Sequence, residues 1–124
     1  MVKTIAVMGS TGSIGRQTLD VVKANPEKVK IAALAANTND ELLEQQIIAF
    51  NPDIAAVYDV EAAKRLRNRY RGKTEILSGE EGLHAVATYS NIDTVVAAVS
   101  GYAGLRSTLA EEKKKKDIAL ANKE

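Results

Sequence analysis

Residues 9–15 combine three glycines with hydroxyl side chains, at a spacing that could hold a phosphate group. They read Gly-Ser-Thr-Gly-Ser-Ile-Gly, follow an apolar run at residues 4–8, and lead into a helical pattern. Glycines let the backbone approach a phosphate without Cβ clashes, and the free N–H groups at a helix start supply donors and positive potential. Strand, glycine turn and helix together indicate a site for the pyrophosphate of a dinucleotide. The spacing is Gly-x-x-Gly-x-x-Gly rather than the commoner Gly-x-Gly-x-x-Gly, and a turn with a purely structural role is the alternative.

Three side chains in this turn could contact a bound nucleotide. Thr11 and Ser13 place hydroxyls beside the free N–H groups, where they suit phosphate oxygens or, alternatively, cap the helix. Ile14 lies on the first helical turn and could pack on a cofactor ring or in the core.

The second segment of interest is residues 35–39, Ala-Ala-Asn-Thr-Asn, which follows the second expected strand. NAD-dependent enzymes usually place an Asp or Glu here, on the ribose hydroxyls. In this segment no acid stands until Asp40. Because a carboxylate would repel a 2′-phosphate, its absence from residues 35–39 permits NADP.

Other reactive groups are few. The chain has no cysteine, which excludes disulfides, thiol chemistry and a thiolate metal site. His84 is the sole histidine and is expected to be a surface or half-buried residue of a helix. We therefore predict neither a catalytic residue nor a metal site in this chain. Tyr102, between two glycines, could line the pocket or only pack in a loop.

Composition favours a single domain with an aliphatic core. Hydrophobic residues make up 45% of the 124 residues and aromatic residues only 4%, which suits parallel strands buried between helices. The net charge of +1 gives no electrostatic case for binding nucleic acid or a membrane surface. Neither a signal segment nor a membrane-spanning run is visible, so we expect a cytoplasmic protein.

Apolar runs alternate with amphipathic stretches along the whole chain. This alternation predicts an α/β fold, a Rossmann-like doubly wound parallel sheet in a single three-layer domain. The expected strands are residues 4–8, 29–34, 54–57, 74–77, 94–99 and 118–121. The expected helices are residues 14–24, 40–50, 60–70, 80–88 and 103–115. Asn-Pro pairs at residues 25–26 and 51–52 should end two helices, and Asn39 or Asp40 should cap another.

The last residues suggest that the chain belongs to something longer. The final expected strand leads into Asn122, Lys123 and Glu124, which would lie at the carboxyl edge of the sheet, where ligands bind. Because an enzyme rarely ends on such residues, we expect residues 1–124 to be the N-terminal domain of a larger protein.

Three segments together resemble one family. They are residues 9–15 with the following Gln-Thr-Leu-Asp-Val-Val, residues 99–105 (Val-Ser-Gly-Tyr-Ala-Gly-Leu) with Thr108, and residues 119–124 (Ala-Leu-Ala-Asn-Lys-Glu). In this order they resemble the N-terminal part of the 1-deoxy-D-xylulose 5-phosphate reductoisomerase family, and the likeness runs through all 124 residues.

The resemblance implies a cofactor, NADPH, and a set of residues around it. Residues 11–14 would contact its phosphates and nicotinamide side, residues 37–39 its adenosine ribose and 2′-phosphate, and Lys123 the sugar-phosphate substrate. The implied cofactor-binding residues are Thr11, Gly12, Ser13, Ile14, Asn37, Thr38, Asn39, Asn122 and Glu124.

The resemblance also implies the activity of the whole enzyme. The family isomerises 1-deoxy-D-xylulose 5-phosphate and reduces it to 2-C-methyl-D-erythritol 4-phosphate, in non-mevalonate isoprenoid biosynthesis. A divalent metal, Mg²⁺ or Mn²⁺, would be held by a catalytic domain that is absent from this chain, so the chain alone would be inactive. We expect the full-length enzyme to be a homodimer that binds neither nucleic acid nor membrane.

The chain departs from the family pattern at the expected 2′-phosphate site. The family usually has Gly at the position of Asn37 and often Arg or Lys at that of Thr38, whereas this chain offers only neutral donors. Two alternatives remain open on the sequence. One is a dinucleotide-binding module without catalysis, and the other is the cofactor domain of a different NADP-dependent oxidoreductase, such as a semialdehyde dehydrogenase.

Overall fold

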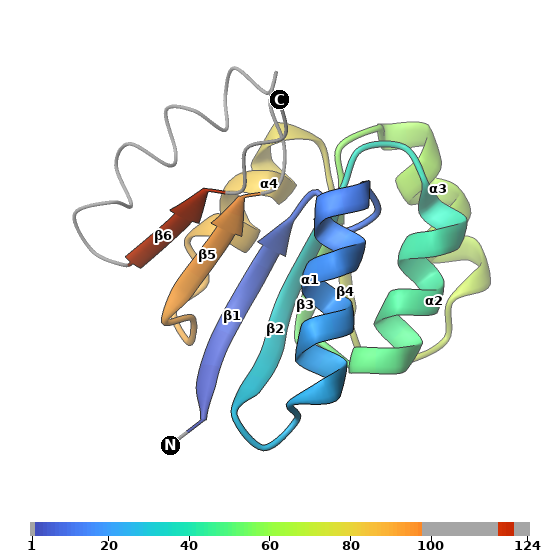
Figure 1. The fold of residues 1–124 in the computed structure, drawn as a ribbon. Coiled ribbons are helices and arrows are strands. Elements are labelled where there is room, and N and C mark those ends of the chain that lie inside the picture. The colour runs from blue at the N-terminus through green and yellow to red at the C-terminus, as the bar shows by residue number, and fades with distance from the viewer. Residues whose placement is uncertain (1, 98–116, 121–124) are drawn as a thin grey trace.

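The computed structural model describes residues 2–97 in full and the backbone of residues 117–120. Within these ranges six strands form one parallel sheet in the order β4-β3-β2-β1-β5-β6 (Figure 1). The strands are β1 (Lys3–Met8), β2 (Val29–Ala36), β3 (Ile54–Val57), β4 (Glu75–Ser78), β5 (Thr94–Ala97) and β6 (Asp117–Leu120). The described helices are α1 (Ser13–Ala24), α2 (Asp40–Phe50), α3 (Val60–Arg69) and α4 (Gly79–Ala87).

The helices cover both faces of the sheet, which gives three layers (Figure 1). Leu19 of α1, Leu43 of α2 and Leu66 of α3 share one core with Val7 and Leu34 of the sheet. On the other face, the α4 residues Leu83, Val86 and Ala87 pack with Ala6, Met8 and Val95. Burial on both faces explains the nearly continuous apolar strands, such as Ile-Ala-Ala-Val in β3, all of whose residues are buried.

The strand order reverses direction at β1. From β1 the chain adds β2, β3 and β4 outward in one direction, and then returns to β5 on the other side of β1. Right-handed crossovers require the connecting helices to change face at this reversal, which is why α4 alone of the described helices lies opposite α1. In open α/β sheets, ligands bind beyond the carboxyl ends of the two strands at such a reversal. The glycine turn follows β1 at this position.

The predicted fold class is confirmed, with small errors at the element ends. Helix α2 and strand β3 have their predicted bounds, and Asn39 caps α2 through its Oδ1, which accepts a hydrogen bond from the Leu42 N–H at 3.1 Å. The prediction that β2 ends at residue 34 is wrong, because Ala35 and Ala36 continue it and pair with β1 or β3. Other element ends differ from the predicted ones by one residue. Strand β1 begins at residue 3, helix α1 at 13 and helix α4 at 79. Helix α3 ends at residue 69, helix α4 ends at 87, and strand β4 covers 75–78.

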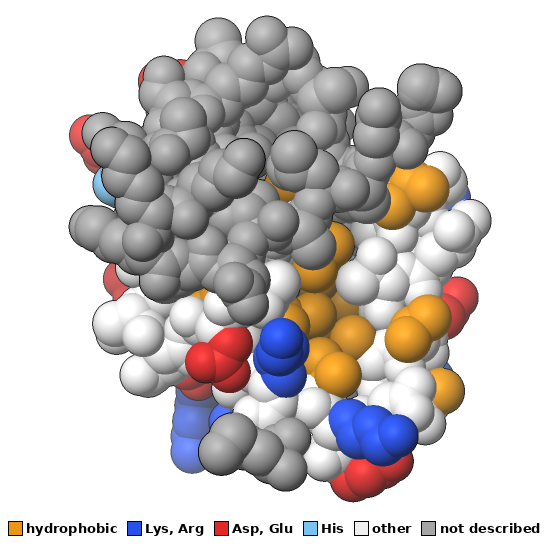
Figure 2. Space-filling view, turned by 60° about the vertical axis from the view of Figure 1, so that its left-hand side comes forward, with side chains coloured by type: hydrophobic (Ala, Val, Ile, Leu, Met, Phe, Trp, Pro, Cys, Tyr) orange, Lys and Arg blue, Asp and Glu red, His pale blue; other side chains and the backbone are white. Residues whose placement is uncertain are grey.

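Several predicted features lie outside the described residues. They are the helix at residues 103–115, the strand residues 98, 99 and 121, Tyr102, and the site residues Asn122, Lys123 and Glu124. The predicted strand at 118–121 corresponds to β6, which pairs in parallel with β5. Figure 2 is a space-filling view of one face of the molecule. Near the centre of that face, apolar side chains lie beside the grey residues. Among the described residues, no helix is long and apolar enough to cross a membrane.

Candidate dinucleotide-binding site

The turn after β1 is held against the end of β2. The backbone N–H groups of Gly9 and Ser10 both donate to the carbonyl oxygen of Ala35, at 2.8 and 2.9 Å. Gly9 has φ +83°, a left-handed conformation that side chains rarely adopt. The chain therefore turns sharply at Gly9 while remaining hydrogen-bonded to the neighbouring strand.

The other two glycines of the turn differ in what the backbone requires of them. A Cβ on Gly15 would lie 2.0 Å from the carbonyl oxygen of Gly9, so α1 packs on the turn only because this residue has no side chain. A Cβ on Gly12 would meet only the Gly9 carbonyl oxygen, at an ordinary 3.6 Å, and the Gly12 φ is −79°. The fold thus needs Gly9 and Gly15, whereas Gly12 is free of any such constraint among the described residues.

The N-terminus of α1 presents donors to an anion. Gly12 is the N-cap residue and no side chain caps this end. The backbone N–H groups of Ser13, Ile14 and Gly15 have no acceptor among the described residues, and the first turn contains no acid. Unpaired N–H groups and the positive end of the helix dipole favour a bound anion such as a phosphate. Gly12 and Ser13 are exposed, and Thr11 and Ile14 are half-buried, so all four positions can be reached by a ligand.

A buried amide from α2 fixes the carbonyl side of the same turn. Gln46 Nε2 donates to the carbonyl oxygen of Ser10 at 2.9 Å. Both residues are buried, and the Ser10 hydroxyl has no hydrogen-bond partner. Gln46 was not among the residues predicted from the sequence. Its position beside Leu43 and Ile47 on the buried stripe of α2 was the available signal, because a buried amide needs a polar partner.

The second predicted segment, residues 37–39, forms the loop between β2 and α2. All three side chains are exposed. The Asn37 carbonyl oxygen accepts a hydrogen bond from the Asp59 N–H, and the Thr38 carbonyl oxygen accepts one from the Asp40 N–H, both at 2.9 Å. The Asn39 Oδ1 caps α2. The loop is therefore anchored through its backbone and one cap, while the Asn37 and Thr38 side chains stay available.

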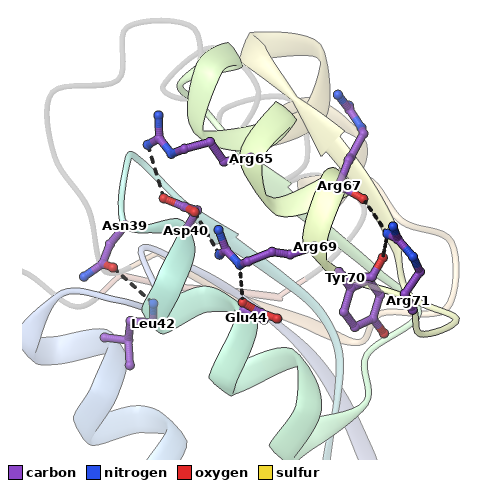
Figure 3. A network of polar contacts seen from close by, with 9 residues as sticks. All are labelled: Asn39, Asp40, Leu42, Glu44, Arg65, Arg67, Arg69, Tyr70 and Arg71. Atoms are coloured by element: carbon purple, nitrogen blue, oxygen red, sulfur yellow. Dashed lines mark hydrogen bonds and ion pairs between the residues drawn. The ribbon is translucent and has the colours of Figure 1, made fainter.

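Asp40, which begins α2 directly after this loop, forms an ion-pair cluster with α3 (Figure 3). Its Oδ1 lies 3.2 Å from Arg65 Nη2 and its Oδ2 lies 2.8 Å from Arg69 Nη2. Arg69 Nε also contacts Glu44 Oε1 at 2.7 Å. Burial raises the pKa of Asp40, but the contacts with the Arg69 and Arg65 guanidinium groups outweigh it and hold the pKa below its usual value. Asp40 is thus paired with arginines, a pairing that was not predicted from the sequence. Three further acids, Asp59, Glu61 and Glu80, line the hollow in which Asn37 lies.

The described residues of the site line two hollows rather than one. Ser13 lies at a groove of about 530 Å³ between α1 and α2, together with Arg16, Gln17, Gln46 and Phe50. Asn37 lies at a hollow of about 440 Å³ with Tyr58, Asp59 and Val60. The glycine turn and the loop after β2 are joined through the backbone, because the Gly9 and Ser10 N–H groups both donate to the Ala35 carbonyl oxygen near the end of β2.

Among the described residues, no group of three or more His, Cys, Asp or Glu side chains could hold a metal ion. His84 is exposed on α4, and its carbonyl oxygen accepts from the Thr88 N–H at 3.0 Å. Its predicted place on a helix surface is confirmed.

The chain matches known proteins along its whole length. The family model described as 1-deoxy-D-xylulose 5-phosphate reductoisomerase matches residues 5–124. The chain is 53% identical over 124 residues to 1-deoxy-D-xylulose 5-phosphate reductoisomerase 1 of Bacillus anthracis. The matched region covers 100% of this chain and 32% of that protein. The chain is 49% identical over 125 residues to the 1-deoxy-D-xylulose 5-phosphate reductoisomerase of Ruminiclostridium cellulolyticum, again covering 32% of the relative. The chain thus spans about a third of the length of these relatives.

Solved structures share the fold. The 1-deoxy-D-xylulose 5-phosphate reductoisomerase of Zymomonas mobilis in complex with NADPH superposes with a TM-score of 0.88 and 35% identity, over 98% of this chain and 32% of that one. A DOX-P reductoisomerase in complex with NADPH, fosmidomycin and magnesium has a TM-score of 0.83 and 35% identity, over 98% of this chain and 30% of that one. The family match over residues 5–124 shows that this chain belongs to the 1-deoxy-D-xylulose 5-phosphate reductoisomerase family.

Proposed function

We propose that this chain is the NADPH-binding, N-terminal domain of a 1-deoxy-D-xylulose 5-phosphate reductoisomerase. The observation that carries the proposal is the glycine turn at the strand reversal. Gly9 and Gly15 are required by the backbone, whereas Gly12 is exposed and unconstrained at the unpaired start of α1. The close approach of a phosphate accounts for a glycine at that position. The NADPH complex of the Zymomonas mobilis relative supports the choice of ligand.

The residues present suit NADPH in two places. In the proposal Thr11, Gly12 and Ser13 bind the pyrophosphate through N–H and hydroxyl donors, and half-buried Ile14 packs against the nicotinamide side. Asn37, Thr38 and Asn39 face the adenosine ribose and its 2′-phosphate. The remaining proposed contacts, Asn122 and Glu124 to NADPH and Lys123 to the substrate phosphate, lie outside the described residues.

NADPH, when bound, supplies the hydride that reduces the isomerised sugar phosphate. The role of this chain is to bind and orient the cofactor at the carboxyl edge of the sheet. The proposal assigns the divalent metal that the reaction needs, Mg²⁺ or Mn²⁺, to the rest of the enzyme. A relative solved with magnesium supports the need for such a metal. A homodimer in the cytoplasm, acting on a small sugar phosphate, completes the proposal.

The test uses the full-length product of the gene and the 124-residue chain side by side. With 1-deoxy-D-xylulose 5-phosphate and Mg²⁺ or Mn²⁺, the full-length protein should consume NADPH, and the chain should bind NADPH without turnover. Full-length protein that binds NADPH but leaves the substrate unchanged would indicate a cofactor-binding module without this activity. Turnover by the 124 residues alone would show that the catalytic groups lie within them, contrary to the proposal.

A further inference from the structure

The loop expected to face the 2′-phosphate carries no positive charge of its own. Its side chains are Asn37, Thr38 and Asn39, and Asn39 Oδ1 is already occupied in capping α2. A phosphate that carries more than one negative charge binds more strongly to a cation than to neutral donors, because charge-assisted hydrogen bonds are about twice as strong. The nearby elements must supply that cation if NADPH is to be preferred over NADH.

Arg65 of α3 is held at this loop by a contact to the residue that follows it. Arg65 Nη2 donates to Asp40 Oδ1 at 3.2 Å, and Asp40 follows Asn39 directly. Figure 3 shows the Arg65 guanidinium above the start of α2, on the side where Asn39 begins the helix. Its side chain is 58% exposed, so it remains open to a ligand.

Arg69 in the same cluster is already engaged. It contacts Asp40 at 2.8 Å and Glu44 at 2.7 Å, and its side chain is less exposed than that of Arg65. Asp40 is therefore paired with both arginines, and Arg69 is shared between Asp40 and Glu44. A guanidinium has five N–H donors, and the contact to Asp40 Oδ1 uses one of those of Arg65.

We propose that Arg65 binds the 2′-phosphate of NADPH and sets the preference of this chain for NADPH over NADH. Asp40 positions the guanidinium at the mouth of the loop, and the planar fork offers its remaining donors to phosphate oxygens. The cation comes from the neighbouring helix α3, since the loop itself has none. This inference rests on the proposed NADPH-binding function and adds to it the residue that reads the 2′-phosphate.

The experiment measures dissociation constants for NADPH and NADH on the full-length protein carrying Arg65→Gln, Arg65→Lys or the control Lys64→Gln. Lys64 is next to Arg65 on α3 and its side chain is 62% exposed. Within the described part of the chain, its one ion pair is with Glu61 of the same helix, at 3.7 Å. Arg65→Gln should raise the NADPH dissociation constant about fivefold, as expected for a partly exposed charged hydrogen bond, and leave NADH unchanged. Arg65→Lys, which keeps the charge and loses the fork, should lie between, and Lys64→Gln should match the unmodified protein.

Unchanged NADH binding also shows that the Arg65 variants are folded. Equal losses for both cofactors would make Arg65 a structural residue, and unchanged NADPH binding would show that it does not contact the phosphate; either result overturns the inference while the proposed function stands. Unmodified protein that binds both cofactors equally would also overturn it. Unmodified protein that binds neither would refute the proposed function itself.

Discussion

Gln46 on α2 reaches across to the turn after β1, where its Nε2 donates to the carbonyl oxygen of Ser10 at 2.9 Å. Residues 36 positions apart in the sequence are thereby joined inside the core. The contact fixes the turn from one side, while the N–H groups of Gly9 and Ser10 fix it to Ala35 from the other. The shape of the proposed phosphate site thus depends on a residue that would not touch the phosphate.

Gln46→Leu should loosen this turn. It leaves the buried Ser10 carbonyl without a donor, which should cost about 1–2 kcal/mol of unfolding free energy and weaken NADPH and NADH binding alike. Urea unfolding and cofactor titration measure the two effects. Gln45→Leu, at the exposed neighbouring position, is the matched control. The role assigned to Gln46 fails if the two variants behave alike.

Gly12 and Gly15 should respond to added side chains in opposite ways. Gly15→Ala places a Cβ 2.0 Å from the Gly9 carbonyl oxygen and should destabilise the fold by about 3 kcal/mol. Gly12→Val suits the extended backbone there (φ −79°, ψ 174°), so circular dichroism should stay native while NADPH affinity falls about tenfold or more. A native Gly12→Val variant with unchanged affinity would mean that this turn does not hold the nucleotide.

The ion pairs of Asp40 should make stability depend on pH. Its pKa is held below the usual value despite burial, so the stabilisation is present above the unfolded-state pKa and is lost as pH falls through the folded-state value. Asp40→Asn should therefore lower the melting temperature by roughly 5 °C at pH 7. The difference from the unmodified chain should shrink below about pH 4. A difference that stays constant between pH 7 and pH 3 would argue against a charged Asp40 in the folded state.

Thr38→Arg should give the loop a cation of its own. An arginine fork matches a phosphate, so NADPH affinity should rise several-fold, by roughly 1 kcal/mol, with little change for NADH. High salt should erode the gain, because screening weakens exposed charge pairs. Equal changes in the two affinities would show that residues 37–39 do not face the adenosine ribose.

The sequence was enough to predict elements whose ends carry local signals. Helix α2 has its predicted bounds because Asn39 caps it and the Asn51-Pro52 pair stops it. The end of β2 was missed because Ala35 and Ala36 show no strand pattern by themselves. They continue the strand because they are buried in the sheet, where Ala35 pairs with Met8 and Ala36 with Val57.

The candidate site was predictable in its chain positions and not in its supporting contacts. Glycine spacing located the turn, but only the packing of α1 on Gly9 separates the structural Gly15 from the unconstrained Gly12. The pairing of Asp40 with Arg65 and Arg69 depends on α2 and α3 lying side by side, 25 or more residues apart. No local pattern encodes such a distance.

The most direct test of the account is an amide chemical-shift titration of the isotope-labelled chain with NADPH and, separately, with NADH. We predict that NADPH shifts the amides of residues 11–15 and 37–39, and that NADH shifts the first group with weaker effects on the second. Shifts confined to the groove between α1 and α2, around Gln17 and Phe50, or no shifts at all at residues 11–15, would contradict the assignment of the glycine turn as the cofactor site.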